Sequence, residues 1–303
     1  MIFEEPRYLY SGDRYLLLEF GDEMNLELNF KALGLAETVA DDPIPGVIET
    51  VPSFATLLVH YEPDQTDFHT LKDALHERVA SLGSTADITL PSRIVELPCC
   101  YDDPWTKAAV DDYRKKIKMI EPNPEATARL NGLRDVRELI KVHSTPQYWV
   151  AAVGFWPGLP FMMSLDPRYV LTVPKYNPPR TWTPQGTVGM GGSCTAIYPV
   201  NTPGGYQIFG RTPVPIWDGA QKFAPFSKSP VLLKPGDRVK FVPIDAREFI
   251  EIENEVAAGT YTYNIVDYDL FAVARYTQFF EQGKKDVGYS AAAAEEQSAT
   301  TVA

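Results

Sequence analysis

Glycine and proline recur throughout residues 154–218, yet aromatic and apolar residues stand between them. Two of the densest runs are Gly154–Pro160 and Pro203–Thr212. A flexible linker would lack the aromatic side chains that can form a core. Glycine permits positive φ angles and close backbone approach, and proline fixes the shape of loops. The segment therefore predicts a tightly turning β structure rather than a linker.

Amide, guanidinium and phenol side chains are set among these turns, without a His, a Cys pair or a carboxylate cluster. Asn and Gln side chains can each donate and accept hydrogen bonds, and Arg presents a planar fork that suits a carboxylate. Such a set predicts a site that holds its ligand by hydrogen bonds, with no protein nucleophile and no metal. The polar residues in question are Asn177, Arg180, Gln185, Tyr206, Gln207 and Arg211.

Composition narrows the class of protein. The 303 residues are enough for about two domains, and 45% hydrophobic with 12% aromatic content indicates a packed globular chain. The net charge of −12 argues against nucleic acid or an anionic membrane as the main partner. No run of about 18 apolar residues is present, so no membrane span is expected.

The cysteines and the N-terminus indicate a compartment. Three cysteines, of which Cys99 and Cys100 are adjacent, do not form a plausible disulfide framework. The first residues contain no basic region followed by an apolar run, so no signal peptide is visible. We therefore expect a cytoplasmic protein.

The first hundred residues show strand and helix patterns in the order β-α-β-β-α-β. The clearest helix covers Asp67 to Leu82, where apolar residues recur at steps of three and four. This order predicts an α+β fold that begins with a ferredoxin-like split-βαβ domain over residues 1–100. The other expected elements are strands at Arg14–Phe20, Val47–Val51, Ala55–Tyr61 and Arg93–Leu97 and a helix at Asn25–Val39.

After a helical connector at residues 101–147, short strands recur at close intervals with turn signals between them. This spacing favours an all-β barrel over βαβ units. We expect the barrel domain to cover residues 148–285, with a C-terminal helix near Asp269 to Gln282, and a disordered tail to cover residues 286–303. The expected strands are Tyr148–Phe155, Tyr169–Val173, Gly186–Met190, Thr195–Val200, Tyr206–Gly210 and Arg238–Ile244.

Several blocks of this sequence resemble the allophanate hydrolase subunit 1 family, which also supplies half of the carboxyltransferase domain of biotin-dependent urea carboxylase. The block at Gly154–Pro160 is like the stand-alone subunits, which include 5-oxoprolinase components and a sporulation kinase inhibitor. The block at Lys175–Pro184 is closer to urea carboxylase. The resemblance implies a ferredoxin-like domain followed by a cyclophilin-like β-barrel. The remaining matching blocks are Leu165–Arg168, Gly186–Gly189 and Pro203–Thr212.

The resemblance also implies a reaction, which is carboxyl transfer from carboxybiotin to a urea-like or amide nitrogen. In that chemistry Asn177 and Gln207 would hydrogen-bond a neutral acceptor, and Arg211 would hold a carboxylate. These three are the expected catalytic residues. The expected substrate-binding residues are Lys175, Tyr176, Arg180, Gln185, Gly204, Gly205 and Tyr206.

The resemblance further implies that a subunit 2-like protein completes the site, with a biotin carboxylase and a biotin carrier as further candidate partners. The chain has no recognisable ATP-binding glycine loop and no biotin acceptor site. ATP would therefore be used by a partner, and carboxybiotin would arrive on a partner's carrier. The acceptor stays open among urea, guanidine, allophanate, 5-oxoproline and other amides.

Two alternatives remain at this stage. The chain could be a regulatory protein-binding module that inhibits a sensor kinase, as the sporulation kinase inhibitor of this family does. The polar residues could also have structural roles. Gly204 and Gly205 can form a hairpin turn, and Arg211 can bind neighbouring carbonyls and hold the barrel together.

Overall fold

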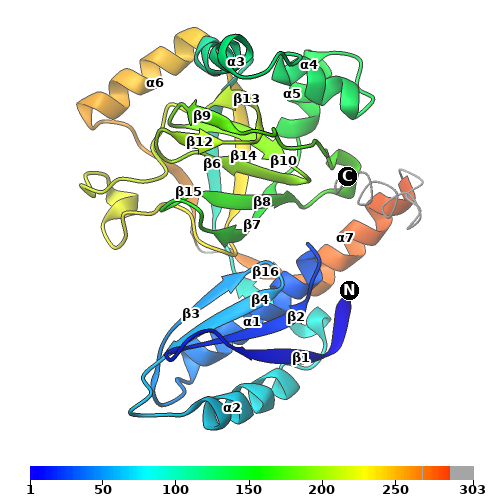
Figure 1. Cartoon of the computed structure of the whole chain (residues 1–303), viewed down its shortest axis with the longest axis vertical. Helices are drawn as coiled ribbons and strands as arrows, with labels where there is room; N and C mark the ends of the chain where they lie inside the picture. Colours follow the sequence, from blue (N-terminus) through cyan, green and yellow to red (C-terminus); the bar gives the residue numbers. More distant parts are fainter. Residues whose placement is uncertain (268, 287–303) are drawn as a thin grey trace. The chain divides into compact units, whose positions relative to one another are not determined.

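The computed structural model describes residues 1–267 and 269–286 (Figure 1). The described residues divide into two compact units, one formed by residues 1–93 with 269–279 and the other by residues 94–267 with 280–286. Most of the predicted disordered tail, residues 287–303, lies outside the described residues. Helices and strands both occur throughout the described part, which confirms the mixed α and β character.

The N-terminal unit contains a four-stranded antiparallel sheet in the order β1-β2-β4-β3. Its helix α1 begins where the Asn25 side chain accepts from the amide of Glu27, and α2 begins at Asp67 in the same manner. In β2 and β4 the leucines and other apolar residues alternate between buried and half-buried positions, so one face of the sheet forms the core with α1. The elements are β1 (Ile2–Tyr10), β2 (Tyr15–Gly21), α1 (Leu26–Asp41), β3 (Val47–Ser53), β4 (Thr56–Tyr61), α2 (Phe68–Ser81), the short pair β5 (Thr89–Pro91) and β16 (Leu270–Ala272), and the 3₁₀ turn Thr85–Asp87.

One predicted strand lies elsewhere. The sequence places the strand at Arg93–Leu97 in the N-terminal sheet, but the structure places β6 (Ile94–Tyr101) in the sheet of the other unit. The place beside β2 is taken by β1, which the sequence analysis does not predict. The prediction is wrong at this point because local pattern identifies a strand without identifying the strand it pairs with.

The second unit contains a closed barrel of seven strands in the order β13-β10-β11-β8-β7-β14-β6, with β13 pairing to β6. All neighbours are antiparallel except β14 and β6, which are parallel. The expected barrel is therefore confirmed, while its likeness to cyclophilin stays a prediction. The strands are β7 (Tyr148–Val153), β8 (Pro160–Ser164), β9 (Arg180–Thr183), β10 (Thr187–Gly191), β11 (Cys194–Ile197), β12 (Thr202–Gly204), β13 (Gln207–Arg211), β14 (Arg238–Ile244) and β15 (Asn264–Val266); β9 and β12 form a separate pair, and β15 adds to β6.

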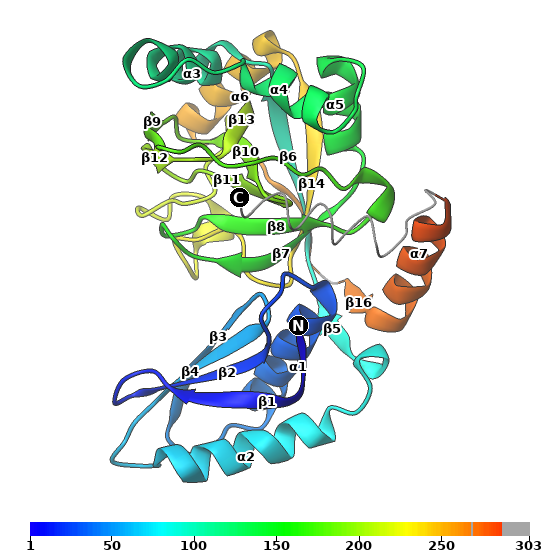
Figure 2. The ribbon, with the colours of Figure 1, turned by 45° about the vertical axis from the view of Figure 1, so that its right-hand side comes forward.

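Helices of this unit gather at the end of the barrel opposite β7 (Figures 1 and 2). Asp103, which is 1% exposed, caps α3 by accepting from the amides of Trp105 and Thr106. Asp245 and Glu248 form a reciprocal capping box at the start of α6. These helices are α3 (Pro104–Lys116), α4 (Asn123–Leu130), α5 (Val136–Ser144) and α6 (Ala246–Ala258), and the unit also has 3₁₀ turns at Pro167–Tyr169 and Ala224–Phe226. Helix α7 (Val273–Asp286) follows β16, and its first half belongs to the N-terminal unit. The predicted strand at Tyr169–Val173 is replaced by one of these turns and an isolated bridge at Val173.

A polar network is enclosed in the barrel core. His143 is fully buried, with Nδ1 2.8 Å from the Tyr101 hydroxyl and Nε2 3.2 Å from Thr195 Oγ1. The Tyr148 hydroxyl donates to the backbone carbonyl of the same histidine, at 3.0 Å. Burial lowers the pKa of His143 from 6.5 to about 3, so the ring is neutral at ordinary pH. This network is structural, because it satisfies polar groups that no solvent reaches.

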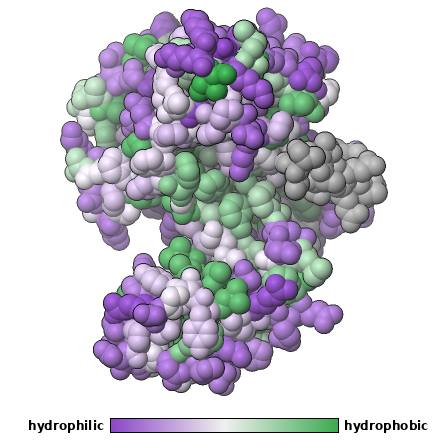
Figure 3. Space-filling model, viewed as in Figure 1, coloured by the Kyte–Doolittle hydropathy of each residue, from purple (hydrophilic) through white to green (hydrophobic). Residues whose placement is uncertain are grey.

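Hydrophilic side chains cover much of the face drawn in Figure 3, in keeping with the acidic composition. Within the described residues, none of the helices combines the length and the apolar character that crossing a bilayer requires.

Candidate functional site

A cavity of about 340 Å³ opens on the barrel unit, and three tyrosines contribute to its wall. We call it the tyrosine pocket. Three loops or strand ends meet there, namely the loop before β8, the segment before β9 and the β11–β13 connection. The lining residues are Phe155, Leu159, Phe161, Lys175, Tyr176, Pro179, Ala196, Tyr198, Pro203, Gly204, Gly205 and Tyr206. The pocket is therefore mostly aromatic and apolar, with one ammonium group and the backbone of two glycines.

The loop before β8 presents an aromatic ring at this pocket. Backbone hydrogen bonds from Gly154 to Leu159 and from Leu159 to Trp156 close the loop. Gly158 has φ of +79°, and Phe155 has φ of +67°, a left-handed conformation that is uncommon for a bulky residue. The Phe155 side chain is 70% exposed. The loop thus holds an apolar ring in solvent at the edge of the pocket, against the usual preference of phenylalanine.

The segment before β9 is fastened to the wall by hydrogen bonds. The amide of Tyr176 donates to the carbonyl of Gly205, at 2.6 Å, and the hydroxyl of Tyr113 on α3 donates to the carbonyl of Pro178, at 2.8 Å. The rings of Tyr113 and Tyr176 lie 4.8 Å apart. Lys175 places its ammonium 5.4 Å from the ring of Tyr206, which is a cation–π distance.

Arg180 lies behind the wall rather than in the cavity. It is 1% exposed, and its guanidinium donates to the carbonyl of Tyr206 at 2.5 Å and to Thr183 Oγ1 at 3.3 Å. The guanidinium also lies 4.9 Å from the ring of Tyr176. Burial lowers the pKa of Arg180 from its usual value. Arg180 therefore supports the pocket through the groups that line it.

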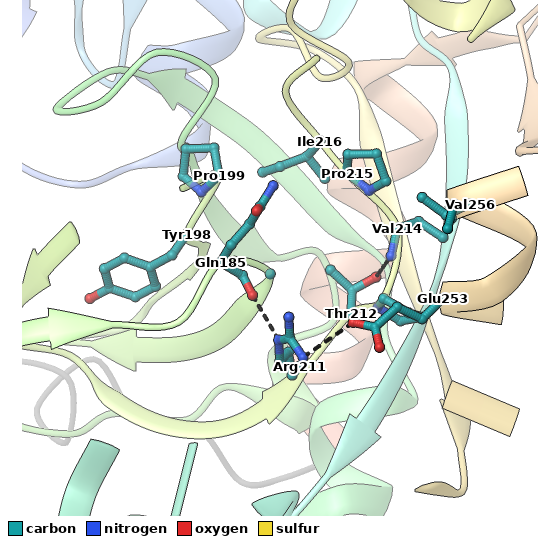
Figure 4. A pocket seen from close by; sticks show the side chains of 13 residues that line it. Gln185, Tyr198, Pro199, Arg211, Thr212, Val214, Pro215, Ile216, Glu253 and Val256 are labelled. Carbon is teal, nitrogen blue, oxygen red and sulfur yellow. Dashed lines mark hydrogen bonds and ion pairs between the residues drawn. The ribbon is translucent and has the colours of Figure 1, made fainter. Parts of the chain in front are cut away.

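A second cavity, of about 280 Å³, contains Gln185 and Arg211 (Figure 4). Arg211 Nε donates to the carbonyl of Gln185 at 2.8 Å, and its guanidinium lies 3.6 Å from the Glu253 carboxylate. The rings of Trp105 and Phe249 each lie 5.1 Å from the guanidinium carbon. Arg211 thus joins β13 to α3 and α6, which fits its structural alternative. We call this cavity the arginine cleft.

The ten predicted site residues do not meet in one place. Lys175, Tyr176, Gly204, Gly205 and Tyr206 line the tyrosine pocket, and Gln185 and Arg211 line the arginine cleft. Gln207 is 8% exposed and donates through Nε2 to the carbonyl of Pro174, at 3.0 Å, while Asn177 is exposed. Neither of these two amides is among the lining residues of either cavity.

Sequence reasoning did not select Tyr198 or Asn123. Tyr198 lines both cavities, and Figure 4 shows its ring directed away from the arginine cleft. Asn123, on α4, is fully buried, accepts from the amide of Ile208 at 2.8 Å and donates to the Tyr176 hydroxyl. An Asn followed by Pro in a helical connector gives no local signal of such a role.

The described residues contain no group of three or more His, Cys, Asp or Glu side chains placed to hold a metal ion. The three cysteines are buried, and burial raises the pKa of Cys194 to about 12 and that of Cys100 to about 11. Thiols with such pKa values are poor nucleophiles at neutral pH. The pocket chemistry available to this chain is therefore hydrogen bonding, stacking and charge.

Residues 6–226 match the family described as carboxyltransferase domain, subdomain C and D. This match covers more than half of the chain. The chain belongs to that family. It is 32% identical to a 5-oxoprolinase subunit of Bacillus subtilis over 254 residues, which are 80% of this chain and 95% of that one. It is 30% identical to urea amidolyase of Saccharomyces cerevisiae over 290 residues, which are 93% of this chain but 16% of the yeast protein.

Solved structures extend the likeness to the fold. The crystal structure of Kluyveromyces lactis urea carboxylase matches with a TM-score of 0.82 and 26% identity, over 95% of this chain and 27% of that one. This carboxyltransferase-family chain therefore spans a small part of the multi-domain relatives and nearly the full length of the 5-oxoprolinase relative. Its enzyme relatives support a role as an enzyme subunit.

Proposed function

We propose that this chain is a carboxyltransferase subunit of a biotin-dependent, urea carboxylase-like or amide-hydrolysing complex. It would act on urea or a related amide or guanidine compound, together with a subunit 2-like partner. The observation that carries the proposal is the tyrosine pocket, whose flat rings and single ammonium group suit a planar nitrogen compound that carries a carboxyl group. The likeness to urea carboxylase covers 95% of the chain and gives independent support.

The side chains of the tyrosine pocket are of the chemical types that could bind the head group of carboxybiotin. Tyr176 and Tyr206 offer faces on which a flat ureido ring can stack, and Lys175 offers charge to a carboxylate. When bound, carboxybiotin supplies an activated carboxyl group to the acceptor nitrogen. Lys175 and the pocket tyrosines would bind and orient that group against the acceptor, and the apolar lining would exclude water.

Among the residues that the structure describes, the lining of the pocket supplies no carboxylate, imidazole or thiol as a general base. Its described lining residues include no Asp, Glu, His or Cys. The proton that leaves the acceptor nitrogen would therefore be taken up by the ureido nitrogen of biotin that gives up the carboxyl group. Phe155 at the edge of the pocket is 70% exposed, and an exposed apolar ring there supports closure by a partner protein. ATP would be consumed by a partner.

The proposed activity predicts acceptor-stimulated loss of carboxybiotin when the chain is mixed with its subunit 2-like partner. Urea, guanidine, allophanate and 5-oxoproline are the acceptors to compare. Lys175→Met should lower kcat/KM by about tenfold or more, because a charged hydrogen-bond donor to the carboxylate is lost. Arg211→Ala and Gln207→Ala should lower kcat/KM less, and only as far as each substitution destabilises the folded protein, because both side chains donate hydrogen bonds to backbone carbonyls.

Lys228→Met is the matched control, since Lys228 is an exposed lysine outside the pocket and should leave the rate unchanged. A verified complex that consumes carboxybiotin at the same rate with and without every acceptor would contradict the proposal. So would an equal effect of the Lys175 and Lys228 substitutions.

A further inference from the structure

The guanidinium of Arg180 is buried behind the tyrosine pocket without an acidic partner. Among residues 1–267 and 269–286, no carboxylate forms an ion pair with it. Its partners are the carbonyl of Tyr206 and the hydroxyl of Thr183. Burying a charge without a counter-charge costs stability, so such groups are commonly retained for function. The positive charge must act on the groups beside it.

The positive charge of Arg180 acts on two phenols of the pocket wall. The oxygen of Tyr176 accepts from the amide of Asn123, and the guanidinium of Arg180 lies 4.9 Å from the centre of the same ring. The positive charge of Arg180 also acts on Tyr198, where it opposes the rise in pKa that burial causes. A phenol oxygen that accepts a hydrogen bond keeps its own O–H to donate. A cation beside a phenol also makes that O–H a stronger donor.

Both tyrosines belong to the wall of a cavity that favours an anion. Tyr176 and Tyr198 line the tyrosine pocket with Lys175, and the described lining residues include no Asp or Glu. Gly204 stands against the Tyr198 hydroxyl so closely that a Cβ atom there would lie 2.3 Å from the oxygen. Burial raises the pKa of both phenols, so they stay protonated at neutral pH. The pocket is thus a positive site in a protein whose net charge is −12.

We propose that the tyrosine pocket contains an oxyanion subsite, in which Tyr176 and Tyr198, polarised by Arg180, donate their O–H groups to a carboxylate carried by a planar amide or urea. The inference rests on the proposed function, which supplies the amide or urea part of the ligand. What it adds is that the pocket selects a ligand with a negatively charged carboxylate. Arg180 is a positioning residue in this arrangement, since it acts through the two phenols.

The test measures binding to the full chain by calorimetry with two probes of similar size, of which only one carries a negative charge. Malonamate carries an amide and a carboxylate, and malonamide replaces the carboxylate with a second amide. Wild type should bind malonamate about tenfold more tightly, as charge-assisted hydrogen bonds imply. Tyr198→Phe and Tyr176→Phe should each bring the two affinities within about threefold of one another. Tyr261→Phe, which removes a phenol from outside the pocket, should keep the wild-type ratio.

Arg180→Gln should abolish the preference for malonamate over malonamide. If this variant does not fold, the two tyrosine variants test the inference. Equal affinity of wild type for the two probes, binding of neither, or an unchanged ratio in both tyrosine variants would overturn the inference. Failure of this inference can be distinguished from failure of the proposed function. Carboxyl transfer without a charge preference would remove the subsite alone, and a charge preference without carboxyl transfer would remove the proposed function alone.

Discussion

Acidification from pH 7 to pH 4 should lower the free energy of unfolding by about 3 kcal/mol more in wild type than in a His143→Gln variant. In the unfolded chain a histidine takes up its proton near pH 6.5, whereas burial lowers the pKa of His143 in the folded protein to about 3. Between these values the unfolded state binds the proton and the folded state does not. The stability is therefore fully present above pH 6.5 and is lost as the pH falls toward 3.

Denaturant titrations at several pH values measure this difference directly. The glutamine introduced by His143→Gln cannot titrate, although it loses part of the bonding to Tyr101 and Thr195, so the stability of this variant at pH 7 should already be lower. The difference between the slopes against pH is the quantity of interest, because the carboxylates titrate in both proteins. His69→Gln, at an exposed position, is the control and should behave as wild type. Parallel slopes for wild type and His143→Gln would show that His143 is not the acid-sensitive group.

The barrel could be predicted from sequence because its turns contain the residue types, glycine and proline, that mark the ends of strands. Glycine and proline mark the ends of strands such as β10, β13 and β14, and these strands begin within one residue of the predicted positions. Helix α2 was equally clear, since its apolar residues recur with the helical period. Signals of this kind are local, and the structure confirms them.

Strand partnership could not be predicted in the same way. The strand that begins at Ile94 reads as the last strand of the N-terminal sheet, but it pairs with β14, more than a hundred residues later. That pairing depends on which side chains fill the barrel, where Val95 and Leu97 are fully buried. A single sequence shows that these residues are apolar and does not show which core they enter.

The candidate site was predicted as one segment, and the structure divides it between two cavities. Tyr206 immediately precedes β13 and Arg211 ends it, so the first lines the tyrosine pocket and the second the arginine cleft. Asn123 and Tyr198 join the site only through tertiary packing. Nearness in sequence therefore identified the region, while the side chains that point into each cavity depended on the fold.

Replacing Gly204 with alanine should reduce carboxyl transfer by about a hundredfold, whereas the same change at Gly205 should cost less than about tenfold. Strand β12 pairs with β9 and places Gly204 opposite Arg180. An added Cβ atom would lie 2.3 Å from the hydroxyl oxygen of Tyr198 and 2.7 Å from two carbons of its ring. At Gly205 the nearest atom would be the carbonyl oxygen of Tyr176, at 3.3 Å.

The two glycines make a sharp comparison because they are adjacent, line the same pocket and receive the same added methyl group. Tyr198 is 3% exposed, so its ring has little room to move aside, and displacement by about 1 Å is enough to misplace a bound reactant. The assay is kcat/KM for acceptor-dependent loss of carboxybiotin, with thermal unfolding of each variant measured alongside. Equal losses at the two positions, or a loss at Gly204 that only follows unfolding, would show that the Tyr198 hydroxyl has no part in the reaction. A selective loss in a folded Gly204→Ala protein would show that the pocket acts through this phenol, since the substitution leaves the Tyr198 side chain chemically intact.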